Sequence, residues 1–189
     1  MALLSWFAAQ DLNGIQLSLV CVGALPEEDK LVGLGEVSPS IYPSLFKNRR
    51  PLCQEDLDFA QQFWATFSSD DPRSLYEIAG QKIDTFPYLP AAVIAHLRRF
   101  PSPSNGLSII EDKMMRIVHS GIRDRRQVVG QVLEEDQEFG FGDWQYFVYL
   151  KNLYPLLQEE DGLSVNELGE KVLSGEEDFV KWAQHNYYW

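Results

Sequence analysis

Reactive side chains are scarce in this chain of 189 residues, which contains two cysteines and three histidines. Cys21 lies in a predicted strand and Cys53 at a predicted helix start, so we expect two reduced thiols, with Cys21 as a small core residue. None of the histidines, His96, His119 and His185, has a metal-ligating residue three or four positions later. No serine lies in a nucleophile elbow. We therefore predict no metal, no cofactor and no catalytic residue.

Positive charge is also in deficit. Lys and Arg total 16 against 28 Asp and Glu, which gives a net charge of −12. This sign opposes binding to phosphate backbones and to anionic membrane surfaces. Nucleic acid and membrane partners are therefore disfavoured.

Long hydrophobic runs are missing as well. The longest, such as residues 15–22, are far shorter than the ~20 residues of a membrane-spanning helix. The first residues lack the basic start and the cleavage site of a signal peptide. We expect a cytoplasmic protein, and a content of 45% hydrophobic and 23% charged residues is typical of a folded domain.

The N-terminal part begins with an apolar segment and a strand. Residues 3–8 predict a helix with almost no polar face, and residues 15–23 predict a buried strand between Asn13-Gly14 and Gly23. A helix followed by a buried strand is half of an α/β unit. A single strand cannot bury its own edges, so its partners are expected before residue 1 or in another chain.

Short helices follow this α/β remnant. Ser38-Pro39 and Asp71-Pro72 start two of them, residues 54–67 form another, and Pro90 starts the last, which ends before Pro101. The longest helix has apolar residues at helical spacing that are expected to be core: Leu57, Ala60, Phe63, Trp64 and Phe67. The Pro- and Ser-rich stretch 101–106 predicts a linker, which divides the chain into domains 1–104 and 105–189.

The C-terminal domain has its own pattern. Ser108 with Glu111, Asp124 with Gln127, and Asp143 each predict the start of a helix. The third helix carries an apolar set, namely Trp144, Phe147, Val148, Leu150 and Leu153, and Phe147 is expected to be a core residue. Residues 156–158 and 163–165 predict a hairpin, followed by a helix at about 166–173. Three helices and a hairpin are the order of a winged-helix domain, so the predicted fold class is α+β, mostly α, with a winged-helix-like C-terminal domain.

Two motifs suggest ligands. Gly33-Leu-Gly35 is similar to the start of a dinucleotide loop, but Glu36 would repel a pyrophosphate, and a plain turn is favoured. Arg123, Arg125 and Arg126 are the candidate nucleic-acid-binding residues at the start of the second C-terminal helix. Residues 107–189 contain 8 basic and 16 acidic residues, which gives −8, and the hairpin tip 159–161 is acidic, so DNA binding is the weaker interpretation.

A family resemblance adds to this pattern through several short phrases in order and at similar spacing. They are Gly33–Pro39, Arg50–Leu52, Asp70–Pro72, Phe100–Ser102, Asn105–Ser108, Gly142–Trp144 and Asn166–Gly175. Across nearly all of its length the chain resembles the bacterial proteins called domain of unknown function eighteen thirty-five. The resemblance implies an N-terminal α/β part and a winged-helix-like C-terminal part, and it carries no activity with it.

Two departures from the family bear on the extent of the chain. Family members usually have a long segment before the position of Leu3 and a Gly- and Trp-rich ending after the position of Trp189, so the resemblance implies an internal fragment or a trimmed form. The polar residues of any family activity would then lie outside this sequence.

These observations favour a noncatalytic scaffold or protein-interaction module. Its partner would be a protein, either an α/β domain or a second copy of the chain. The first alternative is a DNA-binding transcriptional regulator. The second is a fragment of an enzyme acting on a phosphorylated or nucleotide-like ligand near residues 33–38.

Overall fold

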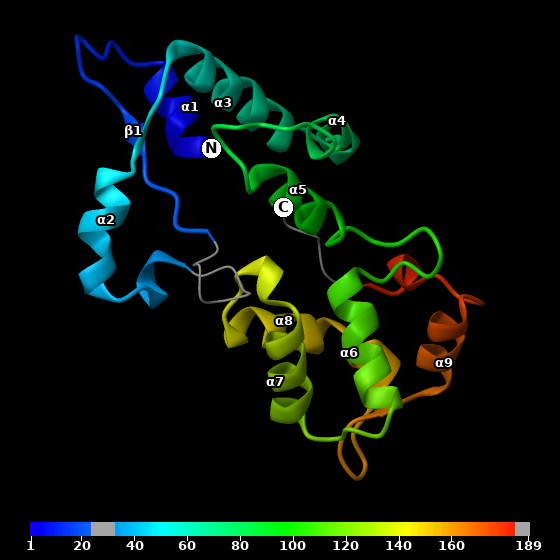
Figure 1. Ribbon diagram of the computed structural model, residues 1–189. Coiled ribbons are helices and arrows are strands. Elements are labelled where there is room, and N and C mark those ends of the chain that lie inside the picture. The colour runs from blue at the N-terminus through cyan, green and yellow to red at the C-terminus, as the bar shows by residue number, and fades with distance from the viewer. Residues whose placement is uncertain (24–32, 184–189) are drawn as a thin grey trace. The chain divides into compact units, whose positions relative to one another are not determined.

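The computed structural model describes residues 1–23 and 33–183 and is mostly helical, with two short antiparallel sheets among these residues (Figure 1). The chain divides into two compact units, Met1–Ile94 and Ala95–Trp189. This architecture agrees with the predicted α+β, mostly α, class. Each unit is described by itself.

The N-terminal unit consists of short elements. Its helices are α1 (Ala2–Ala8), α2 (Tyr42–Lys47), α3 (Gln54–Phe67), α4 (Tyr76–Ala79) and most of α5 (Leu89–Leu97). Turns of 3-10 helix, η1 (Leu34–Glu36), η2 (Pro39–Ile41) and η3 (Pro72–Leu75), precede α2 and α4, and the two strands are β1 (Ser18–Leu19) and β2 (Arg50–Pro51). Prolines at the first positions start η2 and η3 as predicted.

The core of this unit lies where α1 packs along α3 (Figure 1). Leu52, Leu57 and Phe86 are buried in it. One side of α1 packs on this core through Met1, Leu4 and Ala8. The apolar N-terminal segment is therefore a helix with one partly buried face.

The strand of this unit is shorter than predicted and has a different partner. Ser18 pairs with Pro51 and Leu19 with Arg50, in antiparallel register. The sequence predicted that the partners of this strand lie before residue 1 or in another chain. That prediction is wrong for the described residues, because β1 pairs with β2 of the same chain. Cys21, predicted as a core residue, is exposed beyond the end of β1.

Helix α3 spans the predicted residues, but one member of its apolar set is misplaced. Leu57, Ala60 and Phe63 are buried. Trp64 is 38% exposed, and its ring stacks on Phe67 with centroids 5.5 Å apart. The prediction that Trp64 is a core residue is therefore wrong: position 64 lies beside the buried face rather than on it.

The division between the units falls inside α5, ahead of the expected boundary between residues 104 and 105. The predicted linker is tied to the second unit by backbone hydrogen bonds. The amide of Ser102 donates to the carbonyl of Leu107 (2.9 Å), and the amide of Gly106 donates to that of Ser102 (2.8 Å). Just before it, the Arg98 guanidinium donates to the Glu138 carboxylate at 2.8 Å. Residues 95–106 thus fold with the C-terminal unit.

The C-terminal unit contains the predicted order of elements. Helices α6 (Ile109–His119), α7 (Arg125–Glu135) and α8 (Asp143–Asn152) are followed by strands β3 (Leu157–Gln158) and β4 (Ser164–Val165), with helix α9 (Glu167–Ser174) after them. The remaining pieces are the 3-10 turns η4 (Gln137–Phe139), η5 (Tyr154–Leu156) and η6 (Phe179–Lys181). Leu157 pairs with Val165 and Gln158 with Ser164, which confirms the predicted hairpin.

Side-chain caps fix these helix starts. Ser108 and Glu111 form the predicted reciprocal pair, with the Ser108 amide 2.8 Å from the Glu111 carboxylate. Asp124 Oδ1 accepts from the amides of Arg126 and Gln127, both at 3.0 Å. The cap of α8 is one residue earlier than predicted, at Gly142 instead of Asp143.

Helix α8 contributes only part of its apolar set to the core of this unit. Tyr146, Leu150 and Leu153 are buried, and Phe147 is partly buried against them. Phe147, predicted as a core residue, is thus only partly buried, and Trp144 and Val148 of the same apolar set are exposed. Apolar residues surround this helix, so their spacing alone does not decide which side faces the core.

A buried polar contact joins three helices of this unit. Asp136, at the end of α7, forms an ion pair with Lys113 of α6. The Tyr146 hydroxyl of α8 donates to the backbone carbonyl of Asp136 at 3.2 Å. Burial raises the pKa of Tyr146 to about 12, so the tyrosine remains a neutral donor.

Candidate functional site

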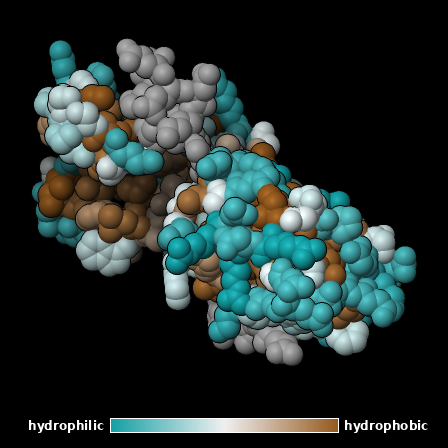
Figure 2. All heavy atoms as spheres, turned by 90° about the horizontal axis from the view of Figure 1, so that it is seen from below, coloured by the Kyte–Doolittle hydropathy of each residue, from teal (hydrophilic) through white to brown (hydrophobic). Residues whose placement is uncertain are grey.

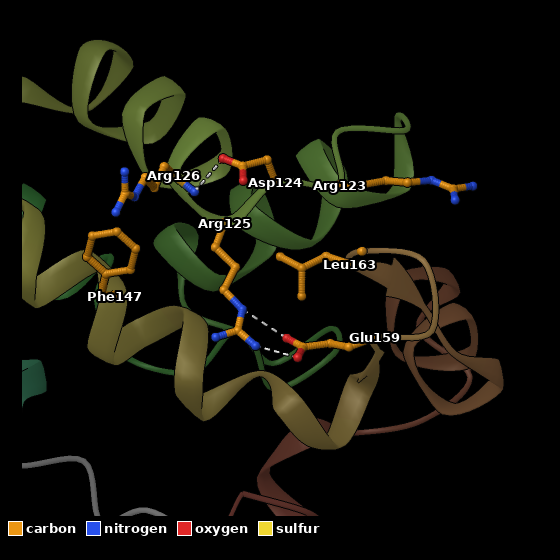
Figure 3. Close-up of a pocket in the computed structure, with 8 residues that line it drawn as sticks. Arg123, Asp124, Arg125, Arg126, Phe147, Glu159 and Leu163 are labelled. Carbon is orange, nitrogen blue, oxygen red and sulfur yellow. Dashed lines mark hydrogen bonds and ion pairs between the residues drawn. The ribbon is translucent and has the colours of Figure 1, made fainter.

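The predicted arginine cluster lines a cleft between the start of α7 and the β3–β4 hairpin (Figure 3). Its volume is about 440 Å³. The lining residues are Arg123, Asp124, Arg125, Arg126, Phe147, Glu159, Gly162 and Leu163. The structure therefore brings together all three arginines and the acidic hairpin, which are far apart in the sequence.

Arg125 points into the cleft toward the hairpin (Figure 3). Its Nε donates to Glu159 Oε1 at 3.0 Å, and its Nη2 donates to Oε2, so the ion pair is bidentate. The guanidinium also lies over the Tyr154 ring, 5.4 Å from its centroid. The bond to Glu159 raises the pKa of Arg125, and its charge is neutralised within the chain.

Arg123 contacts the hairpin through its backbone and through its side chain. Its carbonyl accepts from the amide of Leu163 at 2.9 Å, and its Nη1 lies 3.5 Å from the carbonyl of Asp161. Gly162 has φ +92°, and a Cβ there would lie 2.9 Å from the Cβ of Arg123. Only glycine combines this conformation with this approach. The side chain of Arg123 extends away from the cleft (Figure 3).

Arg126 lies on the other side of the cleft, near Phe147 (Figure 3). Its side chain has no hydrogen bond or ion pair with the rest of residues 1–23 and 33–183. The amides at the start of α7, where a helix can bind a phosphate, already donate to Asp124. A carboxylate thus occupies the anion position at the helix start, and one guanidinium remains exposed beside it.

The glycine-containing turn at residues 33–36 shows the same pattern. The amide of Gly33 donates to the Glu36 carboxylate at 2.6 Å. The Tyr42 hydroxyl donates to the carbonyl of Leu34 at 3.1 Å and holds the turn against α2. The sequence predicted that Glu36 would repel a pyrophosphate. Its carboxylate also accepts from the Gly33 amide, which is the group that would donate to a phosphate.

The remaining reactive residues lie apart from one another. His96 contacts Phe100 edge to face, and burial together with Arg99 lowers its pKa. His119 Nε2 lies 3.3 Å from the Glu170 carboxylate, and Cys53 is exposed at the start of α3. His185 is outside the described residues. Within the described part of the chain, no group of three His, Cys, Asp or Glu residues is arranged to hold a metal.

Each unit also exposes an apolar patch, and the two patches are separate candidate surfaces. On α1, Leu3 is 65% exposed and Trp6 57% exposed, opposite the side that packs on the core. On α8, Trp144 is 75% exposed, one turn before the exposed Val148. Hydrophobic residues gather over the surface of the N-terminal unit (Figure 2). The apolar composition of residues 3–8 indicated the patch on α1. The sequence of α8 did not indicate which of its faces is exposed to solvent.

Comparisons with known proteins found no counterpart: no family model matches the chain, and neither does a curated protein or a solved structure. Within residues 1–23 and 33–183, every helix is too short or too polar to cross a membrane.

Proposed function

We propose that this chain is a noncatalytic protein-interaction module with a winged-helix-like C-terminal part. The observation that carries the proposal is the outer face of α1, where Leu3 and Trp6 are exposed. Met1, Leu4 and Ala8 already anchor the helix on its own core, so the two outer side chains are not needed there.

The chemistry of this face supports a protein partner. Tryptophan is enriched at protein interfaces, where burial of its large apolar surface contributes much of the binding energy. The Trp6 ring is held edge to face against Phe7, with centroids 5.0 Å apart. A rigid aromatic side chain loses little conformational entropy when a partner covers it.

The C-terminal unit supports a winged-helix-like domain that contacts protein. The order α6, α7, α8 and the β3–β4 hairpin matches that of winged helices, in which the third helix reads DNA. Here α8 exposes Trp144 and Val148, and its Gln145 side chain accepts from the amide of Gly142 at 2.8 Å. The exposed face of α8 is therefore suited to apolar contact, and the hairpin next to it is acidic.

The partner is a protein of the bacterial cytoplasm, either an α/β domain or a second copy of this chain. Affinity capture from a bacterial extract tests this with three forms of the immobilised chain: wild type, Trp6→Ser and Tyr76→Ser. Tyr76 is 65% exposed on α4 and serves as the matched control. We expect the same protein to be retained by wild type and Tyr76→Ser and lost with Trp6→Ser. Equal retention by all three would overturn the proposal.

A further inference from the structure

A second surface of the N-terminal unit combines aromatic and basic residues. Tyr42 and Phe46 lie one turn apart on α2 and are both exposed, Phe46 at 62%. Lys47 ends the helix and Arg49 follows two residues later, both exposed. We call these four residues the α2 stripe. It concentrates positive charge in a chain whose net charge is −12.

Arg49 in the α2 stripe is ordered before any ligand binds. Its Nη1 donates to the carbonyl of Phe46 at 3.1 Å, and its Cζ lies 4.4 Å from the centroid of the Phe46 ring. The Nε and Nη2 donors, which form the fork that fits a carboxylate, have no acceptor among the described residues. Lys47 likewise has no ion pair with any described residue.

Nearby charges do not neutralise the α2 stripe. The acid that precedes it in the described chain, Glu36, is turned back onto the amide of Gly33. The next arginine, Arg50, serves the fold instead, because its Nη1 donates to the backbone carbonyl of Asp84. Of the cations at residues 47–50, Lys47 and Arg49 therefore have no carboxylate partner among the described residues.

We propose that the α2 stripe binds an acidic segment of another protein. A carboxylate of that segment pairs with the Arg49 fork, a second one with Lys47, and an apolar side chain packs beside Tyr42 and Phe46. Single-stranded nucleic acid fits less well, because Arg49 covers one face of the Phe46 ring on which a base would stack. Two cations also release few counterions from a phosphate backbone. This site is separate from the α1 face of the proposed function.

Fluorescence anisotropy with the full chain tests the site. The probe is a fluorescein-labelled peptide of alternating glutamate and phenylalanine, and an oligo-dT strand is titrated in parallel. Wild type is compared with Lys47→Glu, Arg49→Glu, Arg49→Lys and the control Lys151→Glu, which makes the same change of charge at an exposed residue of α8. Circular dichroism verifies that each variant is folded.

We expect saturable peptide binding that weakens about tenfold with either glutamate variant, because each reversal replaces an attraction with a repulsion at short range. Arg49→Lys should lie between, since it keeps the charge and loses the fork. Lys151→Glu should bind like wild type. No peptide binding, equal binding by all variants, or stripe-dependent binding of oligo-dT alone would overturn the assignment. The assignment of the α2 stripe does not rest on the α1 face, so a failure of Trp6-dependent capture would not bear on it.

Discussion

Arg125 at the start of α7 and Glu159 at the hairpin form a bidentate ion pair. Both side chains are partly exposed, so water screens their attraction and the pair adds little to stability. Its larger effect is electrostatic: the hairpin already neutralises one of the three candidate phosphate-binding arginines.

The first prediction concerns duplex DNA. We expect no binding at micromolar protein, because the hairpin acids Glu159, Glu160 and Asp161 would face a duplex if the unit docked on it as winged helices do. At physiological salt the Debye length is about 8 Å, which does not screen acids in direct contact with the phosphates. Anisotropy titration on random duplex at low salt, with a salt series, checks this. Saturable, salt-sensitive binding that weakens in Arg125→Ala would favour the regulator instead.

The second prediction concerns the aromatic residues of α3. Phe63→Ala should cost about 3–5 kcal/mol of unfolding free energy, because its ring is buried in the core. Trp64→Ala should cost clearly less, about 1 kcal/mol, since that ring is partly exposed. Urea denaturation of both variants measures the difference. Equal losses would show that Trp64 is a core residue after all.

The third prediction concerns the approach of Gly162 to Arg123. Gly162→Ala should destabilise the chain by more than the ~1–2 kcal/mol expected for a left-handed alanine, because the new Cβ would also meet the Cβ of Arg123 at 2.9 Å. Gly121→Ala is the matched control, with φ +104° and open space around its Cβ position. The difference in thermal unfolding between the two variants separates the cost of the left-handed backbone from the cost of the collision between the two Cβ atoms. A smaller effect at Gly162 than at Gly121 would contradict the described contact.

The fourth prediction follows from Tyr146. Its pKa is raised from the ordinary value of about 10 to about 12 in the folded chain. Between these values the unfolded chain loses the phenol proton while the folded chain keeps it, so the free energy of unfolding should fall as pH rises through this range. In Tyr146→Phe that part of the pH dependence should vanish. Denaturation midpoints across this range measure it, and an unchanged slope in the variant would refute the assignment.

Local signals account for the parts of the fold that the sequence predicted well. Ser108 with Glu111 sets the start of α6, and Asn166 caps α9 by accepting from the amide of Gly169 at 2.9 Å. These contacts span a few residues, so composition and spacing reveal them. The pairing of Leu19 with Arg50 is different. It is non-local, involves only two residues of each strand and includes a proline, which leaves no periodic pattern to detect.

The candidate site was predicted in its residues but not in its geometry. The arginines and the acidic hairpin were both evident, yet the pairing of Arg125 with Glu159 depends on how the hairpin folds back onto α7. The exposed Trp144 was missed because α8 carries apolar residues on every side, and only packing decides which face is buried. For α1 the sequence indicated an apolar segment, and the structure added that Leu3 and Trp6 are its exposed residues.

Site-specific photo-cross-linking at position 6 tests the central claim most directly. A photoreactive phenylalanine replaces Trp6 in the full chain, and the same residue replaces Tyr76 as the exposed control. Illumination in living bacteria, followed by mass spectrometry, identifies the products. The proposed function predicts one dominant cross-linked protein from position 6, either a second copy or another chain, and none of it from position 76. Identical products from both positions, or none from position 6, would contradict a protein-binding face on α1.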